Sequence, residues 1–273
     1  MSKNIRSESS QRVRIYLVSR PSLNITGLQS FLSDEKTEWR RTHRATQAEE
    51  LVEVSGRVCY MSFGEAQSPR DTNAYIDNLI AMGHESVLEH ASWTLLISGV
   101  TRAFTHQLVR HRAGFSFSQL SQQYHDETTA EFIPPGHLAQ YPAARRAWEN
   151  AVNNARTAYA EILETLNAME ADQAHSIQKR EVRRAIRSAA RSVLPNATAT
   201  KIMVTANARS WRYFLKTRGT IPGDLEMRNV AARVLEILRP EAPALFSDFE
   251  VSELTDGPII VHTAHSVKGR SAT

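Results

Sequence analysis

The hydrophobic positions of this chain follow two periods, and each period predicts a different kind of element. Residues 13–19 and 92–100 carry short apolar runs or alternate apolar with polar side chains, which predicts strands, and a third short strand is predicted over 201–206. The second and third of these strands run directly into segments with helical spacing. A chain that combines the two periods in this way is typical of an α+β domain.

Apolar side chains three and four residues apart predict the helices. This spacing recurs over residues 73–82, 101–112, 173–193 and 208–218. The longest apolar stripe, from Trp148 to Met169, has the spacing of a coiled coil. Pro195 ends the helix predicted over 173–193, and Asp224 is placed to cap a last helix. Since no repeat or low-complexity linker interrupts the pattern, we expect one α+β domain over 13–262, with flexible tails at 1–12 and 263–273.

Composition and charge exclude several classes of protein. Hydrophobic residues make up 41% and charged residues 23% of the chain, close to the average for soluble globular proteins. No stretch approaches the ~20 apolar residues that a membrane span needs, and the N-terminus has no apolar signal segment. We therefore expect a cytoplasmic protein with no membrane partner. The net charge of +4 suits small anionic ligands as well as nucleic acid and does not decide between them.

The single cysteine, Cys59, excludes an intramolecular disulfide and a cysteine-based zinc site. Its neighbours are apolar, so we expect it to be buried rather than to act as a nucleophilic thiolate. His84 and His90 lie six residues apart, which is not a metal-binding spacing, and zinc is rejected. Nothing resembles a glycine-rich phosphate loop, so a dinucleotide cofactor has to bind outside a Rossmann unit.

The densest cluster of candidate chemistry is Arg110-His111-Arg112, followed by hydroxyl and amide side chains as far as Tyr124. Arginine bonds two phosphate oxygens at once through its planar fork, so the cluster suits an anion that needs many hydrogen bonds. Cations at the C-terminal end of a helix also complement the helix dipole. Composition alone leaves both interpretations open.

Two further clusters have a structural explanation beside a functional one. Ser86 and Glu89 have the spacing of a capping box, which favours a purely structural role. Arg184, Arg187 and Arg191 lie three and four residues apart on one predicted helix face. Such a face is usually solvated, but a basic helical stripe also suits phosphate or nucleic acid.

Four segments stand in the order found in one enzyme family. They are residues 84–90, Arg-His-Arg with Ser-Gln-Leu-Ser at 118–121, Arg-Ser-Val-Leu-Pro-Asn at 191–196, and Asn-Ala-Arg-Ser-Trp at 207–211. In these segments, and over residues 13–255 as a whole, the chain resembles the flavin-dependent thymidylate synthases. The resemblance implies a mixed or antiparallel sheet flanked by long helices. It also implies a homotetramer with FAD at subunit junctions, methylenetetrahydrofolate as one-carbon donor and NADPH as reductant.

The resemblance also assigns roles to individual residues. The flavin-contacting set is Ser86, Glu89, His111, Arg112, Asn207 and Arg209. The nucleotide-binding set is Gln107, Arg110, Gln119, Ser121, Arg191 and Arg218. Within the second set, Arg191 is expected to hold the phosphate and Arg218 the uracil ring, which makes Arg218 the candidate catalytic residue. In this family reduced flavin supplies the hydride and no cysteine adds to C6 of uracil, in agreement with the solitary Cys59.

Four departures from the family's pattern lie around these residues. Eight residues (113–120) separate Arg-His-Arg from Ser121, where the family has seven before the corresponding serine, so the loop has one extra residue near Ala113-Gly114. Gln123 stands where an arginine is expected, and Tyr213 where a histidine or asparagine is usual. Residues 219–223 replace a histidine-containing segment. We therefore expect a conserved scaffold with altered substrate recognition.

Together these observations predict FAD- and folate-dependent reductive methylation at C5 of a uridine 5′-monophosphate, with both dUMP and UMP as substrates. The predicted partner is a small-molecule nucleotide rather than nucleic acid. A housekeeping enzyme specific for dUMP is one alternative. A non-catalytic relative that binds nucleotide or RNA is another, and the retained arginines speak against it.

Overall fold

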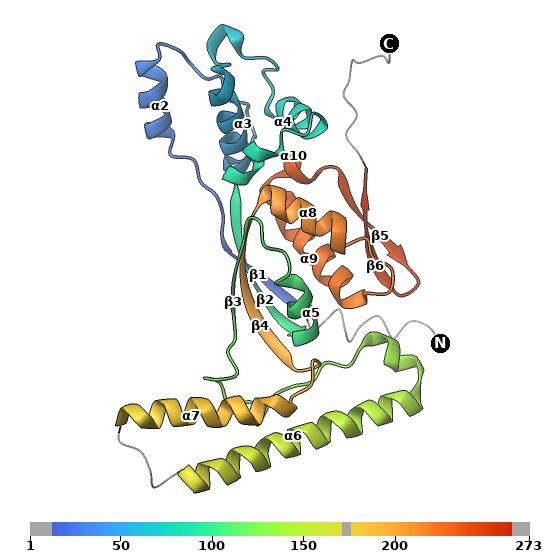
Figure 1. Cartoon of the computed structure of the whole chain (residues 1–273). Coiled ribbons are helices and arrows are strands. Elements are labelled where there is room, and N and C mark those ends of the chain that lie inside the picture. Colours follow the sequence, from blue (N-terminus) through green and yellow to red (C-terminus); the bar gives the residue numbers. More distant parts are fainter. Residues whose placement is uncertain (1–12, 171–175, 264–273) are drawn as a thin grey trace. The chain divides into compact units, whose positions relative to one another are not determined.

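The computed structural model describes residues 13–170 and 176–263, and Figure 1 shows their arrangement. The chain forms two compact units. Among the described residues, the first unit comprises 13–14, 97–110, 117–170 and 176–203, and the second comprises 15–96, 111–116 and 204–263. The predicted tails at 1–12 and 263–273 lie outside the described residues except for Thr263.

One four-stranded sheet contributes to both units. Its strands are β1 (Arg14–Ser19), β2 (Ser92–Thr101), β3 (Phe115–Gln119) and β4 (Ala199–Asn207), in the order β1-β2-β4-β3. Each of the four strands has residues in both units. The α+β class is thereby confirmed, and so are the strands predicted over 13–19, 92–100 and 201–206.

The first unit is built around two long helices, α6 (Pro142–Glu170) and α7 (Ser176–Ala190), which pack against each other (Figure 1). Val152 and Tyr159 of the predicted apolar stripe are buried, while Met169 near its end is 69% exposed. The Tyr159 hydroxyl accepts a hydrogen bond from the backbone N–H of Glu127 at 3.1 Å, which anchors the loop before α6. Short helices α5 (Arg102–Leu108), η3 (Gly136–Gln140) and η4 (Arg191–Val193) complete this unit.

The second unit holds most of the buried core. Its N-terminal part contains α2 (Ile25–Asp34), α3 (Gln47–Tyr60), η1 (Gly64–Ala66), α4 (Thr72–Ala81) and η2 (Glu85–His90). Its C-terminal part contains α8 (Ala208–Arg218), α9 (Leu225–Glu241), α10 (Pro243–Phe246) and the antiparallel hairpin β5 (Phe249–Leu254) and β6 (Gly257–His262). Helix α9 packs against α8, α10 and β6, and its Asp224 cap accepts from the Met227 N–H at 3.2 Å as predicted.

Four sequence predictions need correction. The helix predicted over 101–112 ends at Leu108, and the helix predicted over 173–193 is α-helical only over Ser176–Ala190, with 173–175 outside the described residues. Ser86 and Glu89 do not form a capping box, because η2 is a 3-10 helix whose cap residue makes no side-chain bond. Cys59 is exposed rather than buried. Its apolar neighbours do not imply burial, because Val58 and Tyr60 at the end of α3 are themselves 43% and 73% exposed.

Helix α3 and the hairpin were not predicted, and α3 shows why. Its inward face carries the charged side chains Glu49, Glu50, Glu53 and Arg57, all at most 2% exposed, so the hydrophobic pattern does not mark the buried side. Glu53 accepts from Arg57 Nε at 2.6 Å and from the Thr72 hydroxyl at 2.6 Å. Arg57 also donates to the Pro69 carbonyl at 2.6 Å, so both charges are fully hydrogen-bonded inside the protein.

Among the described residues, no helix is both long and apolar enough to cross a lipid bilayer.

The buried Glu53–Arg57 pair gives the first testable prediction. Glu53→Ala leaves the Arg57 charge buried without its partner, and breaking such a pair lowers the free energy of unfolding by about 3–5 kcal/mol. Glu149→Ala is the matched control, because it removes an exposed carboxylate that pairs with Arg145 at 3.0 Å. An exposed pair of this spacing contributes only about 0.3–0.5 kcal/mol. Urea unfolding followed by tryptophan fluorescence measures both; equal shifts in the two variants would contradict the prediction.

Candidate functional site

His111 and Arg218 form the centre of the predicted site in the second unit. Nε of Arg218 donates a hydrogen bond to Nε2 of His111 at 3.0 Å. The imidazole is 8% exposed and contacts the rings of Phe115, Tyr213 and Phe214 at centroid distances of 5.6, 5.8 and 5.7 Å. Arg218, at the last position of α8, is half-buried. The pair therefore holds a guanidinium beside a cluster of aromatic rings.

The electrostatics of the pair keep the histidine neutral. Burial lowers the pKa of His111, and the positive charge of Arg218 lowers that pKa further. Nε2 accepts a hydrogen bond through its lone pair, so this nitrogen carries no proton. The single ring proton of the neutral form therefore sits on Nδ1. Arg218 is thus fixed by an uncharged acceptor and retains its full positive charge.

Residues 111–116 are attached to the N-terminus of α8 through backbone groups. The N–H of Asn207 donates to the Gly114 carbonyl at 3.4 Å, and the Ser210 hydroxyl donates to the Ala113 carbonyl at 2.9 Å. Asn207 caps α8 by accepting from the Ser210 N–H at 2.9 Å. The extra loop residue of this sequence therefore lies in an ordered contact with α8 and does not extend freely into solvent.

Gly114 is required by that contact. Its φ of +71° is in the left-handed region, and a Cβ at this position would lie 2.1 Å from the Ser210 hydroxyl oxygen. A side chain here would displace the very groups that hold the loop. The insertion is thus possible because the inserted segment contains glycine.

Glu89 and Arg209, two of the predicted flavin-contacting residues, are brought together on the surface. Arg209 NH1 lies 2.7 Å from a Glu89 carboxylate oxygen, and Arg209 Nε lies 3.4 Å from the carboxylate of Glu85. Ser86, on the same 3-10 turn, is exposed, and so is Arg112. Asn207 is buried and occupied with its helix cap. The sequence did not indicate the contacts of Glu85 and Ser210. For Ser210, the i, i+3 spacing from Asn207 is a helix-cap signal that points to its place in the first turn of α8.

The other predicted nucleotide-binding residues lie in the first unit. Gln119 donates its amide to the hydroxyls of Thr105 at 3.0 Å and Thr200 at 3.4 Å, which leaves its carbonyl oxygen available. Ser121 is half-buried and accepts from the Gln123 N–H at 3.3 Å. Gln107 and Arg110 are exposed at the end of α5, and Arg191 opens η4. The positive charge of Arg191 also helps to lower the pKa of Arg102, after the larger effect of burial.

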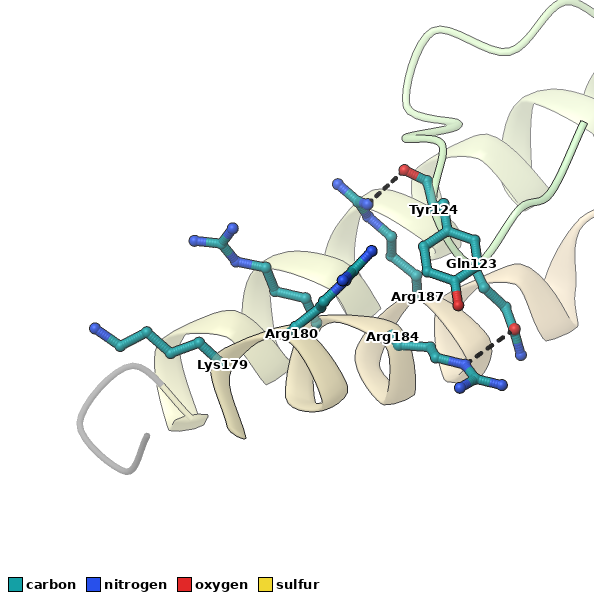
Figure 2. Close-up of a pocket in the computed structure, with 7 residues that line it drawn as sticks. Gln123, Tyr124, Lys179, Arg180, Arg184 and Arg187 are labelled. Atoms are coloured by element: carbon teal, nitrogen blue, oxygen red, sulfur yellow. Dashed lines mark hydrogen bonds between the residues drawn. The ribbon is translucent and has the colours of Figure 1, made fainter. Parts of the chain in front are cut away.

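Gln123, which replaces an expected arginine, is tied to helix α7. Its amide nitrogen donates to the Ser188 hydroxyl at 2.8 Å, and its amide oxygen accepts from Arg184 Nε at 3.2 Å. Figure 2 shows Gln123 and Tyr124 beside the arginines of this helix. Position 123 therefore carries a glutamine in place of the expected arginine, and Arg184 of α7 is held against that glutamine.

Sequence comparison with known proteins identifies relatives of this chain. Residues 42–244 match the family model described as thymidylate synthase complementing protein. The chain is 42% identical over 241 residues to the flavin-dependent thymidylate synthase of Corynebacterium diphtheriae, covering 87% of this chain and 93% of that protein. The enzyme of the same name from Mycolicibacterium gilvum is 45% identical over 208 residues (76% and 82% covered), and that of Mycobacterium tuberculosis 42% over 228 residues (83% and 89%).

The chain belongs to the flavin-dependent thymidylate synthase family. The matched region contains both His111 and Arg218 and all other predicted site residues. In this flavin-dependent thymidylate synthase, the uncharged His111 and the contact of Gly114 with α8 suggest two tests that do not need turnover.

The first test concerns the pH dependence of stability. The native protein holds His111 neutral, whereas in the unfolded chain a histidine takes up a proton near pH 6.5. As the pH falls below about 6.5, the unfolded state binds a proton that the native state does not, so the free energy of unfolding decreases by up to ~1.4 kcal/mol per pH unit. His111→Asn should remove this component, and the exposed His43→Asn should not. Urea unfolding between pH 5 and 8 decides; parallel curves for wild type and His111→Asn would refute the neutral histidine.

The second test concerns Gly114. Gly114→Ala combines a left-handed φ of +71° with a steric clash against Ser210. Gly83→Ala is the matched control, because Gly83 has a φ of +73° and open space around the added Cβ. The control should cost about 1–2 kcal/mol, which is the conformational term alone. We expect Gly114→Ala to lower the melting temperature by clearly more than Gly83→Ala; the same loss in both would show that the α8 contact is unimportant.

Proposed function

We propose that this enzyme methylates C5 of dUMP reductively, with FAD, methylenetetrahydrofolate as one-carbon donor and NADPH as reductant. The observation that carries the proposal is the hydrogen bond between Arg218 and neutral His111. It engages Nε of the guanidinium, and within the described part of the chain the two terminal nitrogens have no hydrogen-bond partner. A guanidinium fixed through one nitrogen presents its other two in a fork suited to a uracil carbonyl oxygen.

The role proposed for Arg218 is to orient the uracil ring and to stabilise charge on it. A donor that is already in place when negative charge develops on a carbonyl oxygen lowers the barrier without reorganising. When bound, reduced flavin supplies the hydride and the folate supplies the carbon. His111 contributes by holding the guanidinium plane without adding a second positive charge.

The residues of the second unit fit a flavin. Ser86 offers an exposed hydroxyl, Arg112 an exposed guanidinium and Glu89 an exposed carboxylate. These are the donors and acceptors that flavin diphosphate and ribityl hydroxyl groups need. We propose that Ser86, Glu89, His111, Arg112, Asn207 and Arg209 hold FAD, and that the homotetramer implied by the family completes its site.

The environment of Cys59 supports chemistry without a protein nucleophile. Its thiol is exposed on α3 and donates only to the Ser55 carbonyl at 3.4 Å. It lies in the last turn of α3, at the opposite end from the helix N-terminus that would favour a thiolate. Since it is the chain's only cysteine, covalent addition of a thiolate to C6 has no candidate residue.

We further propose that UMP is a substrate beside dUMP. Support comes from two features near the substrate residues: the extra residue at Ala113-Gly114 and the replacement at Gln123. Gln123 is bonded to Arg184 and Ser188, so the phosphate contact expected from an arginine at this position has to come from elsewhere. A shifted phosphate alters the room left for a 2′-hydroxyl group.

Assays with purified protein, FAD, NADPH, methylenetetrahydrofolate and either dUMP or UMP test the proposal. We expect the mass of the methylated nucleotide with both substrates. Arg218→Ala should lower kcat about 100-fold or more, the usual effect of removing a charge-stabilising donor. Arg191→Ala should instead raise KM for the nucleotide, by about 1.5–3 kcal/mol in binding free energy.

Cys59→Ala is the control and should keep most of the activity. Loss of methylation in Cys59→Ala, with FAD content intact, would return the mechanism to covalent catalysis. Substrate range is read separately from kcat/KM: a preference for dUMP of about a thousandfold, or ~4 kcal/mol, would remove UMP from the proposal.

A further inference from the structure

A groove of about 480 Å³ lies along helix α7 in the first unit and is lined almost entirely by cations. Lys179, Arg180, Arg183, Arg184 and Arg187 come from the helix, and Gln123 and Tyr124 close one end (Figure 2). Arg184 and Arg187 are anchored there, since Arg184 binds Gln123 and Arg187 donates to the Tyr124 carbonyl at 2.7 Å. The groove is thus a built feature with a defined end.

Within the described part of the chain, most of its charge has no ion-pair partner. Glu181 lies 3.7 Å from Arg184. The pKa of Asp126 is lowered mainly by its hydrogen bond with Thr128 and in part by the charge of Arg187, so this arginine also has an acidic neighbour. Lys179, Arg180 and Arg183 have no ion-pair partner in that part of the chain. Five positive charges on nine consecutive residues repel one another, so an anion bound along them is favoured.

The spacing of the cations indicates the shape of that anion. The cationic rows 179/180, 183/184 and 187 follow one another at about one helical turn, or ~5.4 Å, and span about 12 Å in total. A γ-linked glutamate unit has two more backbone bonds than an ordinary residue of ~3.5 Å, so its free carboxylates repeat at about 6 Å. A chain of such units therefore offers one carboxylate per row of cations.

The position of the groove connects it to the proposed substrate site. Gln123 and Tyr124 at its end lie two and three residues after Ser121, and the Ser121 hydroxyl accepts from the Gln123 N–H. The donor has to lie beside the nucleotide that Ser121 and Gln119 are proposed to hold, and from there an extended end passes Tyr124, whose side chain is 57% exposed, and continues along α7. The folate donor in the proposed function is a ligand with such an extension, because it ends in glutamate.

We propose that this groove binds the γ-linked polyglutamate tail of the folate donor, so that donors with several glutamates are preferred over the monoglutamate. The inference rests on the proposed function for the identity of the donor. The cations act as a row of point charges on exposed carboxylates, and the preference weakens as salt screens them. It concerns the strength of donor binding and not the chemistry at C5.

Steady-state kinetics with methylenetetrahydrofolate carrying one or five glutamates test the proposal. We expect KM to be about tenfold lower for the pentaglutamate, the combined effect of two or three exposed charge pairs. In the double variant Arg180→Gln/Arg183→Gln this ratio should fall to about twofold. The control Arg145→Gln/Arg146→Gln removes the same charge from exposed positions on α6 and should keep the full preference.

Equal KM values in the wild type, or a preference that survives in Arg180→Gln/Arg183→Gln, overturns the proposal. A direct readout is the fluorescence anisotropy of a labelled penta-γ-glutamate peptide added to the purified protein. Displacement of this peptide by a single-stranded oligonucleotide at lower concentration than by unlabelled peptide would assign the groove to nucleic acid and also overturn it. Peptide binding that is lost in the double variant, with no methylation from either donor, supports the groove and contradicts the proposed function instead.

Discussion

The attachment of residues 111–116 to the first turn of α8 is the constraint on which the predicted site depends. Two backbone carbonyls, of Ala113 and Gly114, accept from groups of Ser210 and Asn207. Further along α8, the Phe214 ring contacts the ring of His111, and Arg218 donates a hydrogen bond to His111. The loop contributes only backbone carbonyls to the first part of this attachment, so its own side chains can change, except at Gly114, where the Ser210 and Asn207 side chains approach closely.

Regular patterns in the sequence were sufficient for much of the fold. Strands β1, β2 and β4 and the helices α4, α6, α8 and α9 follow from periodicity and from the Asp224 cap, whereas β3 and the hairpin do not. Helix α3 does not, because Glu50, Glu53 and Arg57 are buried where the pattern predicts apolar residues. Their burial depends on partners far along the chain, such as Thr72 and the Pro69 carbonyl, which no local pattern reveals.

The site was predicted from its motifs, and its internal contacts came only with the structure. Spacing did not indicate that Arg209 binds Glu85 as well as Glu89, or that Gln119 is held by two threonine hydroxyls. The capping-box interpretation of Ser86 and Glu89 was wrong because the segment is a 3-10 turn with a surface ion pair. Exposed Cys59 shows the same limit, since apolar neighbours at a helix end do not imply burial.

The C-terminal hairpin reaches the end of α8 at Gly219. The Ile260 N–H donates to the Gly219 carbonyl at 2.9 Å, and a Cβ on Gly219 would lie 2.3 Å from the Ile260 side chain. Gly219 immediately follows Arg218, so the last strand of the chain braces the residue proposed to hold the uracil ring. Substitutions along β6 therefore change the support of Arg218 without replacing any side chain proposed to contact a ligand. These positions are a target for directed evolution of the substrate range.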